Sequence, residues 1–203
     1  MKFVIVGGVA GGASVAARLR RMDEQAEIVL FERGAYISYA NCGLPYYIGD
    51  TIQERERLFL QTPESFSRRF HLSVKVNQEV TSVNPAEKSI RVTDRVTGRS
   101  YEETYDKLVL SPGAEPLRPP IPGIEAEGIF TLRNVSDTDS IKSYLKDKSL
   151  RKALVIGAGF IGLEMAENLH RLGMDVSIVE MADQVMAPLD FEMAAPVHRH
   201  LAD

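Results

Sequence analysis

The 203-residue sequence predicts an α/β protein with two three-layer domains of one kind, both incomplete, and a small antiparallel β-meander. Two observations predict this class. A strand, a glycine-rich turn, a helix and a second strand follow one another at the start of the chain and again from residue 152. Strand–helix–strand order with tight turns implies parallel strands and right-handed crossovers. Between the copies, residues 72–113 alternate apolar and polar side chains, which is typical of antiparallel strands.

The two copies share one design. The first consists of KFVIV, a glycine turn leading into a helix that reaches Met22, and EIVLFE. The second consists of KALVIG, a glycine turn leading into a helix that reaches Met174, and DVSIVE. Each second strand ends in a glutamate, Glu32 or Glu180. The copies lie about 150 residues apart, too far for a solenoid, so they suggest two nucleotide-binding domains.

The segment between the copies predicts a hairpin or three-stranded meander with turns at Asn84-Pro85 and Thr97-Gly98. A buried strand is expected to follow, from Lys107 to Leu110. Residues 111–128 are rich in proline and glycine and are the best candidate for an interdomain linker.

After the linker, SDTDSIKSYLKDK predicts a capped helix that starts at Ser136 or Asp137. We therefore expect a first domain over residues 1–117, a linker and helix over 118–150, and the first half of a second domain over 151–203.

The glycine turns indicate the ligand class. In a dinucleotide-binding turn the first glycine makes the tight turn, the second lets the backbone approach the pyrophosphate, and the third lets helix and strand pack closely. The helix N-terminus attracts phosphate, and an acidic residue holds the ribose. The second copy matches this pattern fully, with Gly157, Gly159 and Gly162 followed by Glu180. Glu180 favours NADH, because a carboxylate repels the 2′-phosphate of NADPH.

The first copy departs from the pattern at one position. Gly7 and Gly12 occupy its outer positions, but Val9 stands where the middle glycine belongs, with Gly8 and Gly11 beside it. Glycine turns also serve plain packing. The complete strand, turn, helix and acidic residue in both copies favour Rossmann-like domains that bind dinucleotides.

The bulk composition excludes several functional classes. The chain is 44% hydrophobic, has a formal charge of −4 and scatters its Lys and Arg, which argues against a partner that is nucleic acid or a membrane surface. No apolar run approaches the ~20 residues of a membrane-spanning helix, and the glycine pairs of MKFVIVGGVAGG favour a strand and turn over a signal peptide. A single cysteine fits the reducing cytoplasm. No metal site is expected from the histidines, which are His71, His170, His198 and His200.

Cys42 is the only cysteine and lies in ISYANCGLPYYIGD. A free cysteine is usually a small buried hydrophobe, whereas a redox cysteine works as a thiolate, which a helix N-terminus favours. We expect Asn41 and Cys42 to open a short helix with Pro45 in its first turn. On the residues alone, both interpretations stay open.

The two turns, the linker YDKLVLSPGAEPLRPPIPG and the stretch FTLRNVSDTDSI resemble the flavin-dependent pyridine nucleotide-disulfide oxidoreductases over essentially the whole chain. The family linker usually reads ATGA.P..P.IPG, where this chain has Ser111-Pro112-Gly113. Dithiol members carry C-x-x-x-x-C, so that branch is excluded. SYANCGLPY and GGVAGGAS are similar to the coenzyme A-disulfide and CoA-persulfide or polysulfide reductases, which read close to SFANCGLPY and share the Val9 departure.

The resemblance implies that NADH, or NADPH, reduces FAD and that FAD reduces sulfur through Cys42, with CoA as substrate or bound thiol. It implies catalytic roles for Cys42, Asn41 and Ser38. The implied FAD contacts are Gly7, Gly8, Val9, Ala10, Gly11, Gly12, Glu32, Arg33, Val80, Ser111, Gly113 and Arg133. The implied NAD(P)H contacts are Gly157, Gly159, Phe160, Ile161, Gly162, Glu164 and Glu180.

CoA carries phosphates, so its site needs positive charge. Ser14, Arg18 and Arg21 share one face of the first helix by their spacing, and matching positions contact CoA in the resembled reductases. Ser38 and Asn41 are further implied CoA contacts, and Arg68 or Arg69 could assist. A solvated basic face is the competing interpretation.

The chain ends inside a predicted helix, two strands into the second domain. The resemblance implies further chain that completes the fold and forms a homodimer, so we expect this 203-residue piece to be inactive alone. Two alternative functions stay open. One is an NADH oxidase or peroxidase in which Cys42 cycles through sulfenic acid, and the other is a catalytically incomplete nucleotide-binding fragment.

Overall fold

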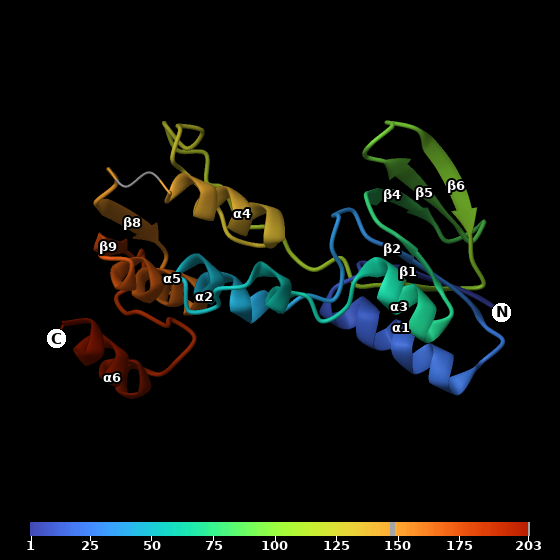
Figure 1. Cartoon of the computed structure of the whole chain (residues 1–203), viewed down its shortest axis with the longest axis horizontal. Helices are drawn as coiled ribbons and strands as arrows, with labels where there is room; N and C mark the ends of the chain where they lie inside the picture. Colours follow the sequence, from blue (N-terminus) through green and yellow to red (C-terminus); the bar gives the residue numbers. More distant parts are fainter. Residues whose placement is uncertain (147–148, 203) are drawn as a thin grey trace. The chain divides into compact units, whose positions relative to one another are not determined.

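The computed structural model describes residues 1–146 and 149–202, and the chain divides into two compact units (Figure 1). Unit 1 comprises Met1–Ala40 and Phe59–Glu115, and unit 2 comprises Asn41–Leu58 and Pro116–Asp203. The segment that carries Cys42 therefore packs within unit 2. The domain limits expected from the sequence stay a prediction, because these units are defined by contacts and not by independent folding.

A parallel sheet forms the centre of unit 1, which confirms the predicted strand–helix–strand topology. Its strand order is β3-β2-β1-β7, and all three pairs are parallel. Val4 of β1 lies between Val29 of β2 and Leu108 of β7. The strands are β1 (Lys2–Val6), β2 (Glu27–Phe31), β3 (Ser73–Lys75) and β7 (Lys107–Leu110).

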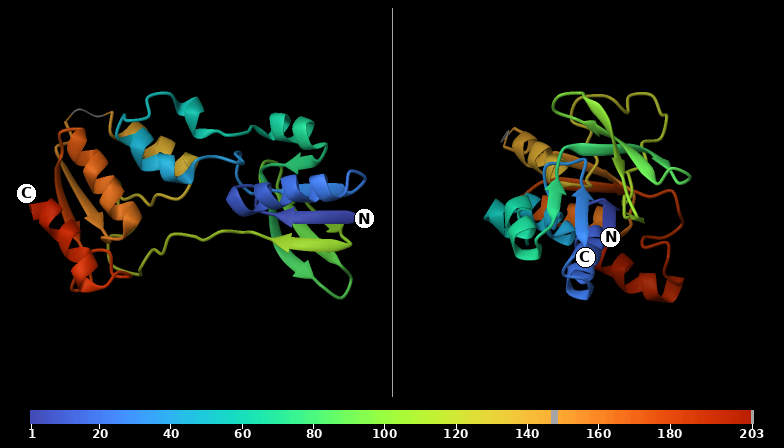
Figure 2. Two further views of the ribbon diagram at one scale, coloured as in Figure 1. Left: turned by 90° about the horizontal axis from the view of Figure 1, so that it is seen from below. Right: turned by 90° about the vertical axis from the view of Figure 1, so that its right-hand side faces the viewer.

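Two layers cover this sheet, because successive side chains of a strand point to opposite faces. Ile5 and Leu30 pack with residues of helices α1 (Ala10–Met22) and α3 (Pro63–Phe70). Val4 packs on the other face, against the meander. Figure 2 shows the helices on one side of the sheet and the meander on the other. Unit 1 is thus a three-layer arrangement with the parallel sheet in the middle.

The meander confirms the expectation from the alternating segment. Its three antiparallel strands lie in the order β4-β5-β6, with a register irregularity between Val80 and Ser82. They are β4 (Gln78–Asn84), β5 (Ser89–Asp94) and β6 (Ser100–Thr104).

Two sequence expectations about individual elements are wrong. The strand from Lys107 to Leu110 forms with the predicted bounds, but Leu110 is 58% exposed, because β7 lies at the edge of its sheet. The helix expected to begin at Ser136 or Asp137 is α4 (Val135–Tyr144), and its N-cap is Asn134. Asn134 and Asp137 form a capping box, in which each side chain accepts a hydrogen bond from the other's backbone N–H. Residues 147–148 of the predicted helix lie outside the described residues.

Unit 2 contains the second strand–helix–strand copy. Strands β8 (Lys152–Ile156) and β9 (Asp175–Val179) pair in parallel, which confirms the prediction. The proline-rich stretch 111–128 forms neither helix nor strand. The helical elements of unit 2 are the 3₁₀ turn η1 (Asn41–Gly43), α2 (Leu44–Ile48), the 3₁₀ turn η2 (Arg55–Leu58), α4, α5 (Phe160–Arg171) and α6 (Phe191–Ala202).

One buried cluster joins α2, α4 and α5. It includes Ile48, Ile141, Met165, Leu169 and Met174, and side chains from β8 and β9 pack against it. The short Cys42 segment is therefore built into the same core as the helix of the second glycine turn.

Candidate dinucleotide and cysteine site

The first glycine turn joins β1 to α1. Gly7 has φ +97°, a left-handed conformation that favours glycine, and its N–H donates to the carbonyl of Phe31 (2.8 Å). The N–H of Gly8 donates to Oε2 of Glu32 (2.8 Å). A Cβ added at Gly12 would lie 1.8 Å from the carbonyl oxygen of Gly7. The third glycine is therefore required for the helix to pack against the turn.

The second glycine turn repeats this geometry. Gly157 has φ +101°, and the N–H of Ala158 donates to Oε2 of Glu180 (2.7 Å). A Cβ added at Gly162 would lie 1.9 Å from the carbonyl oxygen of Gly157. A Cβ at Gly159 would meet nothing within 4 Å. The middle of this turn thus presents open backbone, as close approach of a dinucleotide requires.

Glu180 is held as a carboxylate by backbone amides. Its Oε1 accepts from the N–H groups of Met181 (2.8 Å) and Ala182 (2.9 Å). The hydrogen bond from Ala182, followed by that from Ala158, lowers the pKa of Glu180 below its usual value. The N-terminus of α5 has no side-chain cap, and Phe160 and Ile161 beside it are exposed. The residues of this turn fit the pyrophosphate and ribose of a dinucleotide.

Other predicted flavin residues lie around the first turn in unit 1. The N–H of Ser111 donates to the carbonyl of Val6 (2.8 Å), which sets Ser111 so close that a Cβ on Gly7 or Gly11 would contact it. Gly113 has φ +73°. Arg33 forms an ion pair with Glu115, and Val80 packs against the core shared by the sheet and the meander. Arg133 belongs to unit 2, where its N–H donates to Oδ2 of Asp137 (2.9 Å).

Cys42 lies in the 3₁₀ turn η1, directly before α2, and Pro45 occupies the first turn of α2. This confirms the expected short helix. The Cys42 thiol is free and its residue is exposed, so the interpretation as a buried structural thiol is wrong for this chain. Asn41 shares the turn, whereas Ser38 belongs to unit 1. Ser38 has φ +45° and its N–H donates to the carbonyl of Gly8 (3.0 Å).

The predicted basic face of α1 is exposed, with Ser14, Arg18 and Arg21 all open to solvent. Arg20 of the same helix does not belong to this exposed face and has a structural role. Its guanidinium donates to the carbonyls of Phe70 (2.8 Å) and His71 (2.7 Å) and so ties α1 to the end of α3. In α3, Arg68 and Arg69 are also exposed.

Sequence reasoning missed several contacts that support the site. In unit 2, Val185 donates its N–H to Nε2 of His198 (3.2 Å) and Met186 donates its N–H to the carbonyl of Ala158 (2.9 Å). The bond from Met186 holds the segment after Glu180 against the second glycine turn, and the bond from Val185 ties the same segment to α6. No periodicity or spacing signals such a bond, because its two partners come from different elements.

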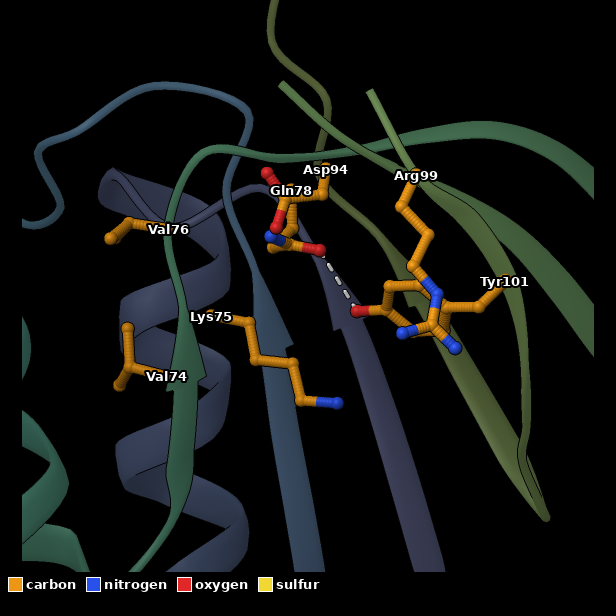
Figure 3. A pocket seen from close by; sticks show the side chains of 7 residues that line it. All are labelled: Val74, Lys75, Val76, Gln78, Asp94, Arg99 and Tyr101. Carbon is orange, nitrogen blue, oxygen red and sulfur yellow. Dashed lines mark hydrogen bonds between the residues drawn. The ribbon is translucent and has the colours of Figure 1, made fainter. Parts of the chain in front are cut away.

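A cavity of about 660 Å³ lies between β3 and the meander in unit 1 (Figure 3). Tyr101 donates its hydroxyl to Oε1 of Gln78 (2.9 Å) across it. The ammonium of Lys75 is paired with Glu103 (3.0 Å), and Asp94 accepts from the N–H of Val96 (2.8 Å). These charged groups are thus engaged, and the cavity contains none of the predicted site residues. Its lining is Val74, Lys75, Val76, Gln78, Asp94, Arg99 and Tyr101.

The parallel strand–helix–strand units and the paired glycine turns define a protein with two Rossmann-like folds of the dinucleotide-binding type. The family model for pyridine nucleotide-disulphide oxidoreductases matches residues 1–203. The chain belongs to this family, as its resemblance implied.

The chain is similar to several reductases within this family. The chain is 40% identical over 196 residues to coenzyme A disulfide reductase of Staphylococcus aureus, covering 97% of this chain and 44% of that protein. It is similar to the crystal structure of reduced CoADR-RHD from Bacillus anthracis, with 59% identity and a TM-score of 0.96, over 99% of this chain and 36% of that one. A NAD-dependent persulfide reductase from A. fulgidus is 40% identical with a TM-score of 0.93, over 100% of this chain and 38% of that one. The chain thus spans less than half the length of these relatives.

Within the part of the chain that the structure describes, no helix is both long and apolar enough to cross a membrane.

Proposed function

We propose that the whole protein to which this chain belongs is a flavin-dependent reductase of coenzyme A-linked disulfides or persulfides. One observation carries the proposal. A single, free and exposed cysteine opens a short helix that packs against the helix of an intact dinucleotide turn. The 40% identity to coenzyme A disulfide reductase supports this class of acceptor.

The two turns have separate cofactor roles in this proposal. The turn from Gly7 to Gly12, with Glu32, holds FAD. The turn from Gly157 to Gly162 holds NADH, because Glu180 is a carboxylate fixed by three amides and repels a 2′-phosphate. FAD, when bound, supplies hydride acceptance from NADH and two-electron delivery to sulfur.

The reaction balances with one protein thiol. The Cys42 thiolate attacks a sulfur of CoA disulfide, forms a Cys42–S–S–CoA bond and expels one CoA thiolate. Two electrons that originate from NADH then break this mixed disulfide, which releases the second CoA and restores the Cys42 thiolate. In this proposal Asn41, which precedes Cys42 in η1, donates a hydrogen bond to the substrate. The exposed Ser14, Arg18 and Arg21 offer a hydroxyl and positive charge for the CoA phosphates.

We further propose that the whole protein is a homodimer and is located in the cytoplasm, as the resemblance implies. The 203-residue chain alone is expected to give no turnover.

An anaerobic titration of the full-length enzyme with NADH tests the proposal. Release of one CoA per flavin during reduction supports it. A dimedone-trapped sulfenate without CoA would support an NADH oxidase or peroxidase instead. Cys42→Ser should lower disulfide reduction to roughly a thousandth of the wild-type rate, while NADH still reduces the flavin. Normal disulfide reduction by Cys42→Ser would refute the central role of this thiol.

A further inference from the structure

Asn168 of α5 is completely buried, and its side chain is only half satisfied. Its Nδ2 donates to the carbonyl of Glu164 (2.8 Å), one turn earlier in the same helix. Its Oδ1 has no hydrogen-bond partner among the described residues. Burying an acceptor without a donor costs free energy, so Asn168 is not the side chain that packing alone would select.

The unpaired end of Asn168 faces Gly49, the residue that ends α2. A Cβ built on Gly49 would lie 2.2 Å from Oδ1, 2.7 Å from Cγ and 2.6 Å from Cβ of Asn168. Gly49 is buried and has φ −82° and ψ 14°, a conformation open to other residues. The backbone therefore does not require glycine at this position. The close approach of α2 to Asn168 does.

Helix α4 holds α2 through a second set of contacts. The ammonium of Lys142 donates to the carbonyl of Tyr47 (2.5 Å) and to Oδ1 of Asp50 (2.6 Å), and it lies 4.2 Å from the centre of the Tyr47 ring. Lys142 thus satisfies a carbonyl at the end of α2, where a cation also complements the helix dipole. A shift of α2 relative to α4 would break these contacts, so α2 has one defined position against α4 and α5.

This position determines where Cys42 lies, because η1 ends at Gly43 and α2 begins at Leu44 with no residue between them. Asn168, on the other side of the contact, lies in α5, which begins at Phe160 directly after the second glycine turn. The Gly49–Asn168 contact is thus the place where the helix behind the thiol meets the helix behind the dinucleotide turn.

We propose that Asn168 is a positioning residue, which through its contact with Gly49 sets the location of Cys42 relative to the NADH-binding turn. The proposal rests on the proposed function for its link to turnover. It predicts that adding atoms at the contact displaces the thiol, and that removing the opposing atoms of Asn168 restores it.

The experiment uses full-length, flavin-bound enzyme and a graded rescue. Gly49→Ala introduces all three close contacts. Gly49→Ala with Asn168→Ala removes Oδ1 and Cγ but leaves the 2.6 Å contact with Cβ, and Gly49→Ala with Asn168→Gly removes all three. The first measurement is the single-turnover rate at which NADH releases CoA from Cys42. The second is the rate at which iodoacetamide alkylates Cys42 in the reduced enzyme, which does not depend on the natural acceptor.

Gly49→Ala should slow CoA release by at least about tenfold, since displacement of a reacting group by about 1 Å can cost 10²-fold. Adding Asn168→Ala should recover part of the rate and adding Asn168→Gly most of it, and the alkylation rate should return toward wild type in the same order. Leu169→Val is the matched control. It loosens the same buried cluster without touching Gly49, and should lower the melting temperature without changing alkylation.

A Gly49→Ala enzyme with both rates within twofold of wild type would overturn the proposal, as would double variants no better than Gly49→Ala. If Gly49→Ala does not fold, recovery of a flavin-bound enzyme on adding Asn168→Gly supports the contact, and failure of that double variant contradicts it. If wild-type enzyme releases no CoA, the proposed function fails, and the ordered alkylation rates still decide the positioning role.

Discussion

The substitution Gly159→Ala tests whether Gly159 is needed for binding NADH or for the stability of the fold. Gly159 has φ −79° and ψ −173°, an extended conformation that alanine adopts without strain. The added methyl group would meet no atom within 4 Å. We therefore expect the free energy of unfolding to change by no more than about 0.5 kcal/mol, which is a shift of about 1–2 °C in melting temperature.

Binding of NADH should respond very differently, because in the proposed function the pyrophosphate approaches the backbone through the open space over Gly159. We expect the Kd for NADH to rise about 10- to 100-fold, or about 1.4–2.8 kcal/mol. Anaerobic stopped-flow reduction of the flavin at varied NADH concentration gives both the Kd and the limiting rate. Reduction by dithionite bypasses the turn and should be unchanged.

Either of two results would refute this reasoning. A Kd within twofold of wild type would mean that the dinucleotide does not approach Gly159. A large fall in melting temperature with a normal Kd would mean that the glycine serves packing after all.

Three further predictions concern unit 1. Gly12→Ala should yield colourless protein, because its Cβ would lie 1.8 Å from the backbone oxygen of Gly7; normal flavin absorbance per protein would contradict this. Thr62→Ala should lower the free energy of unfolding, measured by urea denaturation, by about 1 kcal/mol, because Oγ1 of Thr62 caps α3 by accepting a hydrogen bond from the N–H of Ser65 (3.2 Å). The third prediction concerns Glu103, whose pKa is raised by burial. Hydrogen bonds from Lys2 and Lys75 outweigh burial and lower the pKa of Glu103 overall. The Glu103 carboxylate therefore stabilises the fold fully above its pKa in the unfolded chain, and this stabilisation is lost as pH falls through its pKa in the folded protein. Glu103→Gln should lower the free energy of unfolding by about 1–2 kcal/mol at neutral pH. The melting temperature of this variant should also fall less on acidification than that of the wild type.

The sequence predicts best what is encoded within a few consecutive residues. Both glycine turns, their strands and the short helix after Asn41 depend on local patterns, and all form as expected. The start of α4 is also local, yet three neighbouring residues can each cap a helix. The reciprocal bonds between Asn134 and Asp137 decide among them, and a single-residue preference does not contain this information.

What the sequence does not predict depends on partners that are distant along the chain. Lys107–Leu110 has the composition of a buried strand, but its burial depends on its place at the sheet edge. Gly49 looks like an ordinary turn residue. Only the approach of Asn168, which lies more than a hundred residues away, explains why it must be glycine. For the same reason no local pattern shows that the Cys42 segment packs with α5, the helix that follows the second glycine turn.

The fold demands the third glycine in both turns, and we predict that the ligand demands the middle glycine of the second turn. In both, the third glycine meets the carbonyl of the first at less than 2 Å from an added Cβ, so Gly12 and Gly162 are fixed by packing. The middle position is different. Val9 occupies it in the first turn, where it is the N-cap of α1, and the N–H of Gly8 beside it still donates to Oε2 of Glu32. The backbone of this turn therefore tolerates a side chain at the middle position, and the glycine in the second turn needs another reason. A Cβ at Gly159 would meet nothing within 4 Å, so we predict that the reason is the approach of the NADH pyrophosphate, which would meet a side chain at this position of the second turn.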